Sequence, residues 1–334
     1  MQDVSSAIAS LRTRSDRIYS VKENRKLKVP SAGLAALTQA QLNAWSDQAQ
    51  THTQGGQLPD YIPLLALANS TWFAVQIQGI DGQIHSAGDV TLAFGLMSVV
   101  KPFVLLFLLE QFGKHAVFSR VGMEPSDEPF NSLTQLQTDG GLPRNPMINS
   151  GAIALASLLP GKNAHSRCES LCQWLNQRSN SHLFLDELML DSVRSVPNER
   201  NRAITTLLVE SGYLDSAETA LDTYNHVCCL SGTVADLALL GMLLVHSKGG
   251  ISPEHRRTVN AIMTTCGLYQ ASSRFAVEVG LPTKSGVSGA IVSVVPSQGA
   301  IACYSPALDQ TGNSKAGLFL LQQLAQALDL SVFG

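Results

Sequence analysis

A serine and a lysine stand three residues apart at the start of an apolar segment. Ser98 and Lys101 belong to the stretch SVVKPFVLLFLLEQFG, in which the lysine interrupts an apolar run. On a helix the two side chains share one face, so the lysine amine can reach the serine hydroxyl. An apolar environment lowers the pKa of a lysine, and the neutral amine can then take the serine proton and create a nucleophile. The alternative is a chance SxxK match, with a lysine that extends from a helix end into solvent.

A second motif, far along the chain, fits the same chemistry. Lys284, Ser285 and Gly286 stand directly before the β-rich run GAIVSVV. Serine acyl-transfer enzymes with SxxK use a Lys-Thr-Gly element on a strand that lines the site. A glycine at a strand edge lets the backbone approach a substrate closely. The N–H groups of Val287 and Ser98 can then face the oxygen that becomes negative in a tetrahedral intermediate.

Several segments must fold to bring these two motifs together. Residues 1–57 are polar and mixed, and the stretch LTQAQLNAWSDQAQTHTQGG predicts a helix with a threonine N-cap and a glycine stop. The run TWFAVQIQGIDGQIHSAGD predicts a hairpin, because Asp-Gly supplies the positive φ of a tight turn. A helical pattern dominates from about Ser98 to Cys266, and Thr233 with Asp236 predicts one helix start. The runs RFAVEVG, GAIVSVV and GAIACY predict late strands, and SKAGLFLLQQLAQALDL predicts a closing amphipathic helix.

Strands at both chain ends with helices between them exclude a simple βαβ series. We therefore expect an α/β (α+β) fold, in which an antiparallel sheet built from both chain ends is flanked by helices and carries a large central helical subdomain. The expected organisation is an N-terminal helical extension over residues 1–57 and a catalytic domain over 58–334. Within that domain the sheet region covers about 58–97 and 272–334, and the helical region about 98–271.

Composition limits the class of partner. The chain has 334 residues, 45% of them hydrophobic, and a formal net charge of −3 without a block of like charges. This balance disfavours nucleic acid and anionic membrane surfaces and favours small neutral or zwitterionic molecules. No segment reads as a signal peptide or a bilayer span, so we expect a cytoplasmic protein.

The six cysteines and eight histidines form no recognisable metal or disulfide pattern. Cys168 and Cys172 are four apart, Cys228 and Cys229 are adjacent, and neither paired CxxC nor HExxH occurs. We expect structural or incidental thiols and no metal site.

Nine short motifs occur together in one order. They are DYIPLLA (60–66), DGQIHSAGD (81–89), SVVKPF (98–103), VGMEPS (121–126), NPMINSGAI (145–153), RNRAI (200–204), LDTY (221–224), CGLY (266–269) and GLPTKSGVSGAI (280–291). In these motifs the chain resembles the serine-dependent glutaminases, which share the fold of serine β-lactamases and penicillin-binding proteins. The likeness extends from about Asp60 to the last helix.

The resemblance implies an amidohydrolase that converts L-glutamine and water into L-glutamate and ammonia through a glutamyl-serine ester, without a cofactor. It implies that Ser98 is the nucleophile, Lys101 its general base, and Tyr224 an aid to proton transfer. It also implies a substrate-binding set and a homodimer or homotetramer. The substrate-binding set comprises Tyr61, Ser98, Asn149, Asn201, Tyr224, Tyr269 and Val287, with Val287 in the oxyanion hole.

The chain departs from the family at one position. The family has a glutamate seven residues before the asparagine of its RN motif, where it receives the substrate's α-ammonium group, and this position holds Arg194 here. Glu199 is nearby but needs a local rearrangement after Pro197 to take its place. Another amide, ester or lactam substrate, or a weakly catalytic amino-acid-binding protein, therefore remains as an alternative to glutamine hydrolysis.

Overall fold

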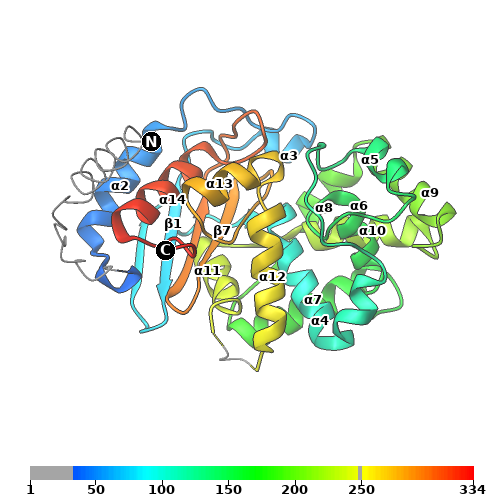
Figure 1. Ribbon diagram of the computed structural model, residues 1–334. Helices are drawn as coiled ribbons and strands as arrows, with labels where there is room; N and C mark the ends of the chain where they lie inside the picture. The colour runs from blue at the N-terminus through cyan, green and yellow to red at the C-terminus, as the bar shows by residue number, and fades with distance from the viewer. Residues whose placement is uncertain (1–32, 247–249) are drawn as a thin grey trace, which may run out of the picture. The chain divides into compact units, whose positions relative to one another are not determined.

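The structure, a computed structural model, describes residues 33–246 and 250–334 (Figure 1). Gly33–Gly334 form one compact unit, and the predicted extension up to residue 32 lies outside the described residues. The strands are β1 (Ala74–Gly79), β2 (Ile84–Gly88), β3 (Phe94–Gly95), β4 (Phe184–Leu185), β5 (Leu230–Gly232), β6 (Thr283–Ser285), β7 (Ala290–Val295) and β8 (Gly299–Tyr304). The α-helices are α2 (Gln39–Thr51), α3 (Pro63–Ala66), α4 (Lys101–Phe118), α5 (Leu133–Thr138), α6 (Asn149–Ala156), α7 (Ala164–Ser179), α8 (Glu187–Arg194), α9 (Glu199–Glu210), α10 (Ala217–Cys228), α11 (Val234–Met242), α12 (Pro253–Cys266), α13 (Ser272–Glu278) and α14 (Lys315–Leu328). Three 3-10 helices are η1 (Leu34–Ala36), η2 (Met97–Val100) and η3 (Tyr269–Ala271).

The main sheet joins strands from both ends of the described chain. Its order is β2-β1-β8-β7-β6, and every neighbouring pair is antiparallel. β1 and β2 form the predicted hairpin, with Gly82 at φ 87° in the turn. β1 then pairs with β8, more than two hundred residues later in the sequence. The predicted antiparallel sheet built from both chain ends is confirmed.

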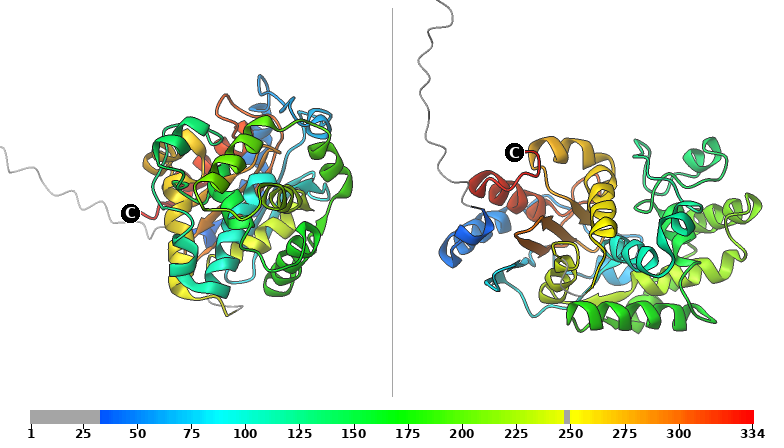
Figure 2. Two further views of the ribbon diagram at one scale, coloured as in Figure 1. Left: turned by 90° about the vertical axis from the view of Figure 1, so that its right-hand side faces the viewer. Right: turned by 60° about the horizontal axis from the view of Figure 1, so that its bottom comes forward.

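Helices cover both faces of this sheet, as Figures 1 and 2 show. Along β7 the side chains alternate between two clusters: Val292 packs in the core that includes α11, and Ile291 packs in the core that includes α14. This alternation is the period of two that a strand imposes. Because both faces are covered, every residue of β7 and β8 is buried. The predominantly apolar sequences of these two strands are explained by that double burial.

The predicted helix with a threonine N-cap is α2. Thr38 and Gln41 form a capping box at its start, in which each side chain bonds to the other residue's backbone N–H. α2 packs against α14 and β2, and the side-chain amide of Gln39 pairs with both backbone groups of Ser86 on the outer edge of the sheet. α2 thus closes an edge strand. The division of the chain at residues 57 and 58 stays a prediction.

The prediction of a strand over RFAVEVG is wrong, because residues 272–278 form α13. Phe275 and Val279 are four apart, so they share one helix face and pack together in the core beside α14. Val277, between them, is 88% exposed. The alternation of apolar residues in the sequence predicted a strand, but Phe275 and Val279 are buried and Val277 is not.

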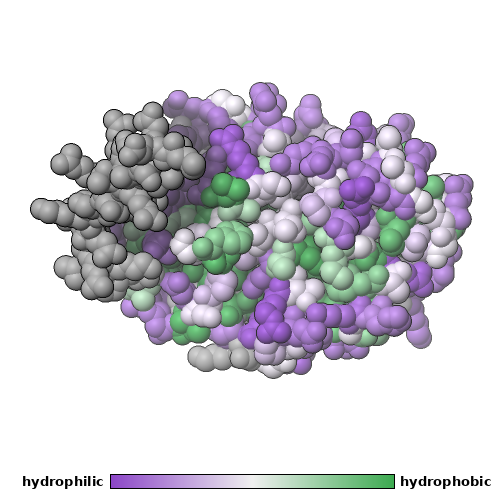
Figure 3. Space-filling view, viewed as in Figure 1, coloured by the Kyte–Doolittle hydropathy of each residue, from purple (hydrophilic) through white to green (hydrophobic). Residues whose placement is uncertain are grey.

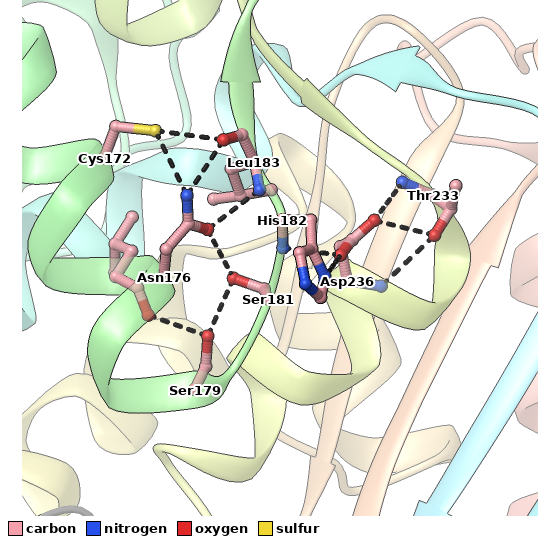
Figure 4. Close-up of polar contacts among 9 residues, drawn as sticks. Cys172, Asn176, Ser179, Ser181, His182, Leu183, Thr233 and Asp236 are labelled. Atoms are coloured by element: carbon pink, nitrogen blue, oxygen red, sulfur yellow. Dashed lines mark hydrogen bonds and ion pairs between the residues drawn. The ribbon is translucent and has the colours of Figure 1, made fainter.

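A second, small sheet supports the helical region and was not predicted. Its order is β3-β5-β4, and it brings the segment before η2 against the end of α10. A network of hydrogen bonds connects the segment just before β4 to α7 and α11 (Figure 4). In it Asn176 on α7 accepts from Leu183 N and donates to Leu183 O at 2.8 and 2.9 Å, while Asp236, in the predicted capping box at the start of α11, accepts from His182 N.

Helices α4 to α10 form the region on the right of Figure 1, where α10 packs against α6, α7 and α9. α4 carries the apolar run predicted to be a buried helix, and residues 101–109 are all buried. Gly113, at φ 74° and ψ 170°, breaks the regular helix near its end. In residues 33–246 and 250–334, none of the helices has the length and apolar character that a bilayer crossing requires.

Candidate active site

Ser98 and Lys101 lie one turn apart, as the motif predicts. Ser98 is the second residue of η2, which runs directly into α4, and Lys101 is the first residue of α4. Both are buried, at 6% and 2% exposure. Met97, just before the serine, has φ 47°, a left-handed conformation that a side chain rarely adopts. The strained turn places the Ser98 side chain on the wall of a cavity.

The Lys101 amine is held by two acceptors. Nζ donates to the Met147 carbonyl oxygen at 3.1 Å and to Asn149 Oδ1 at 2.9 Å. Burial lowers the pKa of Lys101 to about 8, although the neighbouring Cys228 thiol acts in the opposite direction. A neutral amine has two N–H groups and one lone pair, so these two acceptors use both donors. The lone pair remains for a proton, and the described residues give Nζ no hydrogen bond to Ser98 Oγ.

Asn149 connects Lys101 to two other predicted site residues. Tyr224, on α10, donates from its hydroxyl to Asn149 Oδ1 at 3.1 Å, and Asn149 Nδ2 donates to Asn201 Oδ1 on α9 at 3.0 Å. Side chains from α4, α9 and α10 therefore meet at the single amide of Asn149 on α6. Burial raises the pKa of Tyr224 well above its usual value, so at neutral pH the hydroxyl keeps its proton.

Tyr269 approaches the serine from the side of the sheet. It opens η3 with φ 57°, and its ring packs on Phe130 at 4.8 Å between centroids. Its hydroxyl donates to the Ser285 carbonyl oxygen at 3.4 Å. Burial raises the pKa of Tyr269, and a hydrogen bond with the Ser98 side chain partly offsets this rise. Tyr269 therefore lies close to the Ser98 side chain.

The predicted Lys-Ser-Gly element lies on and just after β6, beside η2. Lys284 is fully buried, donates to the Ser285 carbonyl oxygen at 2.5 Å, and stands 4.5 Å from the centroid of the Tyr269 ring. Burial holds the pKa of Lys284 well below its usual value. A Cβ at Gly286 would lie 2.7 Å from the Leu96 carbonyl oxygen, so only glycine lets β6 end against the serine turn.

A cavity of about 570 Å³ opens over Ser98. Six of the predicted site residues line it: Tyr61, Ser98, Asn149, Asn201, Tyr224 and Val287. Lys101 lies behind this lining and contacts it through Asn149. Tyr269 also lies behind it and contacts it through Ser98 and Phe130.

Other lining residues were missed by sequence reasoning. Cys228 lies four residues after Tyr224 on α10, a helical spacing that could have identified it. Phe130, which bridges the lining and Tyr269, carries no comparable local signal. Arg200 was missed as well, whereas Glu199, which also lines the cavity, was named from the sequence as the alternative to Arg194.

Arg194 does not line this cavity. Its guanidinium donates to Asp222 Oδ1 on α10 at 2.6 and 3.1 Å, and both side chains are partly exposed. It lines a neighbouring hollow between the ends of α7, α8 and α10, which shares the lining residues Val193, Val196, Asn198 and Asn225 with the cavity. In the described part of the chain, no group of three or more histidine, cysteine, aspartate or glutamate residues could hold a metal ion.

Comparison with known proteins relates this geometry to a family. A sequence model of the family described as Glutaminase matches residues 56–333. A glutaminase from Synechocystis sp. is 45% identical over 297 residues, which cover 88% of this chain and 91% of the relative.

Two solved structures superpose on most of the chain. The probable glutaminase ybaS is 37% identical with a TM-score of 0.82, covering 89% of this chain and 99% of its own. The Bacillus subtilis glutaminase YbgJ, in a covalent complex with 5-oxo-L-norleucine, is 31% identical with a TM-score of 0.79, covering 88% of this chain and 99% of its own. These neighbours share the β-lactamase-like fold, which confirms the predicted fold class. The chain belongs to the glutaminase family.

Proposed function

We propose that this chain hydrolyses the side-chain amide of L-glutamine through an ester on Ser98. The observation that carries the proposal is the buried Ser98–Lys101 pair, which opens onto a cavity lined by the amide and hydroxyl groups of Asn149, Asn201 and Tyr224. Its relatives are glutaminases, and the covalent complex of YbgJ with 5-oxo-L-norleucine supports a nucleophilic route.

The first half-reaction forms the ester. Ser98 Oγ attacks the amide carbon, and its proton passes to the free lone pair of Lys101. The carbonyl oxygen becomes negative and is stabilised by the N–H groups of Ser98 and Val287. The proton is then delivered to the amide nitrogen, the C–N bond breaks, and ammonia leaves. Tyr224 has its own proton engaged with Asn149, so its oxygen can accept from the amide NH₂.

The second half-reaction releases the acid. Water loses a proton to the neutral amine of Lys101 and attacks the ester carbon, and the Ser98–carbonyl bond breaks as the serine regains a proton. The products are L-glutamate and the free enzyme, and the balance requires no oxidant or reductant.

In the sequence, Arg194 favours a substrate other than glutamine. Since Arg194 pairs with Asp222 outside the cavity, it places no positive charge beside a bound α-ammonium group. That reason for preferring a different amide, ester or lactam is removed. A cytoplasmic location and a homodimer or homotetramer stay predictions.

Ser98→Ala tests the nucleophile. We expect ammonia release from L-glutamine to fall by about a thousandfold or more, because the hydroxyl forms the covalent bond. Intact-protein mass spectrometry should show an adduct with 6-diazo-5-oxo-L-norleucine on the wild type and none on the variant. Ser305→Ala is the matched control, since Ser305 is buried and is absent from the cavity lining. A Ser98→Ala enzyme with near-normal turnover and an unchanged circular dichroism spectrum contradicts the proposal.

A further inference from the structure

The cavity over Ser98 has very few charged groups. Among the described residues that line it, Glu199 is the sole carboxylate and Arg200 the sole guanidinium. A free α-amino acid carries one ammonium and one carboxylate group, so a site that selects it needs charge as well as amide contacts. The amide and hydroxyl groups around Asn149 carry no net charge and cannot supply that selection alone.

The backbone places Glu199 where it can face the cavity. Pro197 ends the segment after α8, and Asn198 adopts φ 51° and ψ 39°, which turns the chain just before α9 begins at Glu199. Glu199 is then the first residue of α9, and Asn201, two residues on, reaches Asn149 from the same helix. A carboxylate in the first turn of a helix is also favoured by the helix dipole.

The three neighbouring arginines have partners other than Glu199, and the partner of Arg200, Asn131, also lines the cavity. Arg200 donates to Asn131 Oδ1 at 3.2 Å, and Arg202 donates to Glu218 at 2.9 Å. Arg194 is paired with Asp222. Within the described residues Glu199 has neither an ion pair nor a hydrogen bond from its side chain, so its carboxylate is available to a cationic group in the cavity.

We propose that Glu199 binds the α-ammonium group of the substrate and makes the enzyme selective for α-amino acids over amides that lack this group. The inference rests on the proposed function. It assigns the recognition to the start of α9 and removes Arg194, at the end of α8, from substrate binding.

The test compares two substrates and two variants. The substrates are L-glutamine and glutaramate, which has the same amide chain without the α-amino group. Glu199→Gln keeps the size of the side chain and removes its charge, and Arg194→Gln is the matched control at the position outside the cavity. Glu199 is exposed, so its replacement leaves the core intact.

We expect Glu199→Gln to lower kcat/KM for L-glutamine about tenfold or more, mainly through KM, because one charge-assisted hydrogen bond is lost. Its kcat/KM for glutaramate should be unchanged, so the preference for glutamine collapses. Arg194→Gln should keep the wild-type preference. Retention of the full preference by Glu199→Gln, or its loss in Arg194→Gln alone, overturns the inference.

A binding measurement separates this inference from the proposed function. A wild-type protein that releases no ammonia from L-glutamine defeats the proposed function, and calorimetry with L-glutamate and glutarate then tests Glu199 directly. Weaker L-glutamate binding in Glu199→Gln, with glutarate binding unchanged, supports the assignment. Equal L-glutamate binding by the wild type and Glu199→Gln overturns it.

Discussion

At the scale of single residues, burial determines what Lys101 can do. A solvated lysine is protonated at neutral pH and cannot accept the serine proton. In this protein the surrounding apolar core disfavours the ammonium form and lowers the pKa of Lys101 to about 8. Met147 and Asn149 then hold the amine with one position free. The core that stabilises α4 therefore also favours the neutral amine that the proposed base requires.

This pKa predicts a pH profile. The active form of Lys101 is the deprotonated amine, so kcat/KM for glutamine should rise as pH increases and level off above about 8. Below that value the rate should fall about tenfold for each pH unit, because the fraction of neutral amine falls in that proportion. Steady-state kinetics between pH 5.5 and about 9.5 measure it, with protein stability followed in parallel. A flat profile between pH 6 and about 8 would assign the general base to another group.

At the scale of elements, the site depends on the contact between the end of β6 and the turn at η2. Gly286 faces Leu96 and Val99, so the strand approaches the backbone that carries Ser98. Val287, the next residue, lines the same cavity as the serine. The two N–H donors of the proposed oxyanion hole therefore come from different elements, and their spacing is set by this one close approach.

Gly286→Ala should disturb that spacing. The new Cβ would lie 2.7 Å from the Leu96 carbonyl oxygen, so β6 and η2 must move apart. We expect kcat to fall by roughly ten- to a hundredfold with a smaller change in KM, because small displacements of reacting groups are costly. Overpacking should also destabilise the fold by about 1–3 kcal/mol. Steady-state kinetics and urea unfolding measure the two effects, and an unchanged kcat would show that the oxyanion donors tolerate the shift.

At the scale of the described molecule, the site lies where the sheet region meets the helical region. Tyr269 and Val287 come from segments beside the sheet, whereas Asn149, Asn201 and Tyr224 come from helices of the other region. The surface seen in Figure 3 is largely hydrophilic, with smaller apolar groups between the polar residues. The sheet that anchors one side of the site is itself covered by α14 and α2.

Helix α2 should therefore contribute to the stability of the whole fold. Leu42 on α2 is fully buried in the core that includes α14. We expect Leu42→Ala to lower the free energy of unfolding by about 2–5 kcal/mol, through lost burial and the cavity left behind. Gln48→Ala, at an exposed position of the same helix, is the control and should change it by less than about 0.5 kcal/mol. Urea denaturation measures both variants. If Leu42→Ala unfolded at the same urea midpoint as the wild type, α2 would not belong to the cooperatively unfolding core.

Features encoded within a few residues could be predicted from the sequence alone. The Ser98–Lys101 spacing, the Asp81-Gly82 turn and the Thr233–Asp236 cap each depend on neighbours in the chain, so their geometry follows from local sequence. The ordered motifs likewise indicated the glutaminase family before any contact was known.

Other features depend on which surfaces are buried, and only the tertiary structure decided them. The segment around Phe275 became a helix because the core beside α14 buries one helix face. Lys101 meets Asn149, and Arg194 meets Asp222, across 48 and 28 residues of chain. Such partners are brought together by packing between elements, which no short sequence period records. For that reason the sequence could predict a nucleophile and its base, whereas the fold decided that Glu199, and not Arg194, lines the cavity.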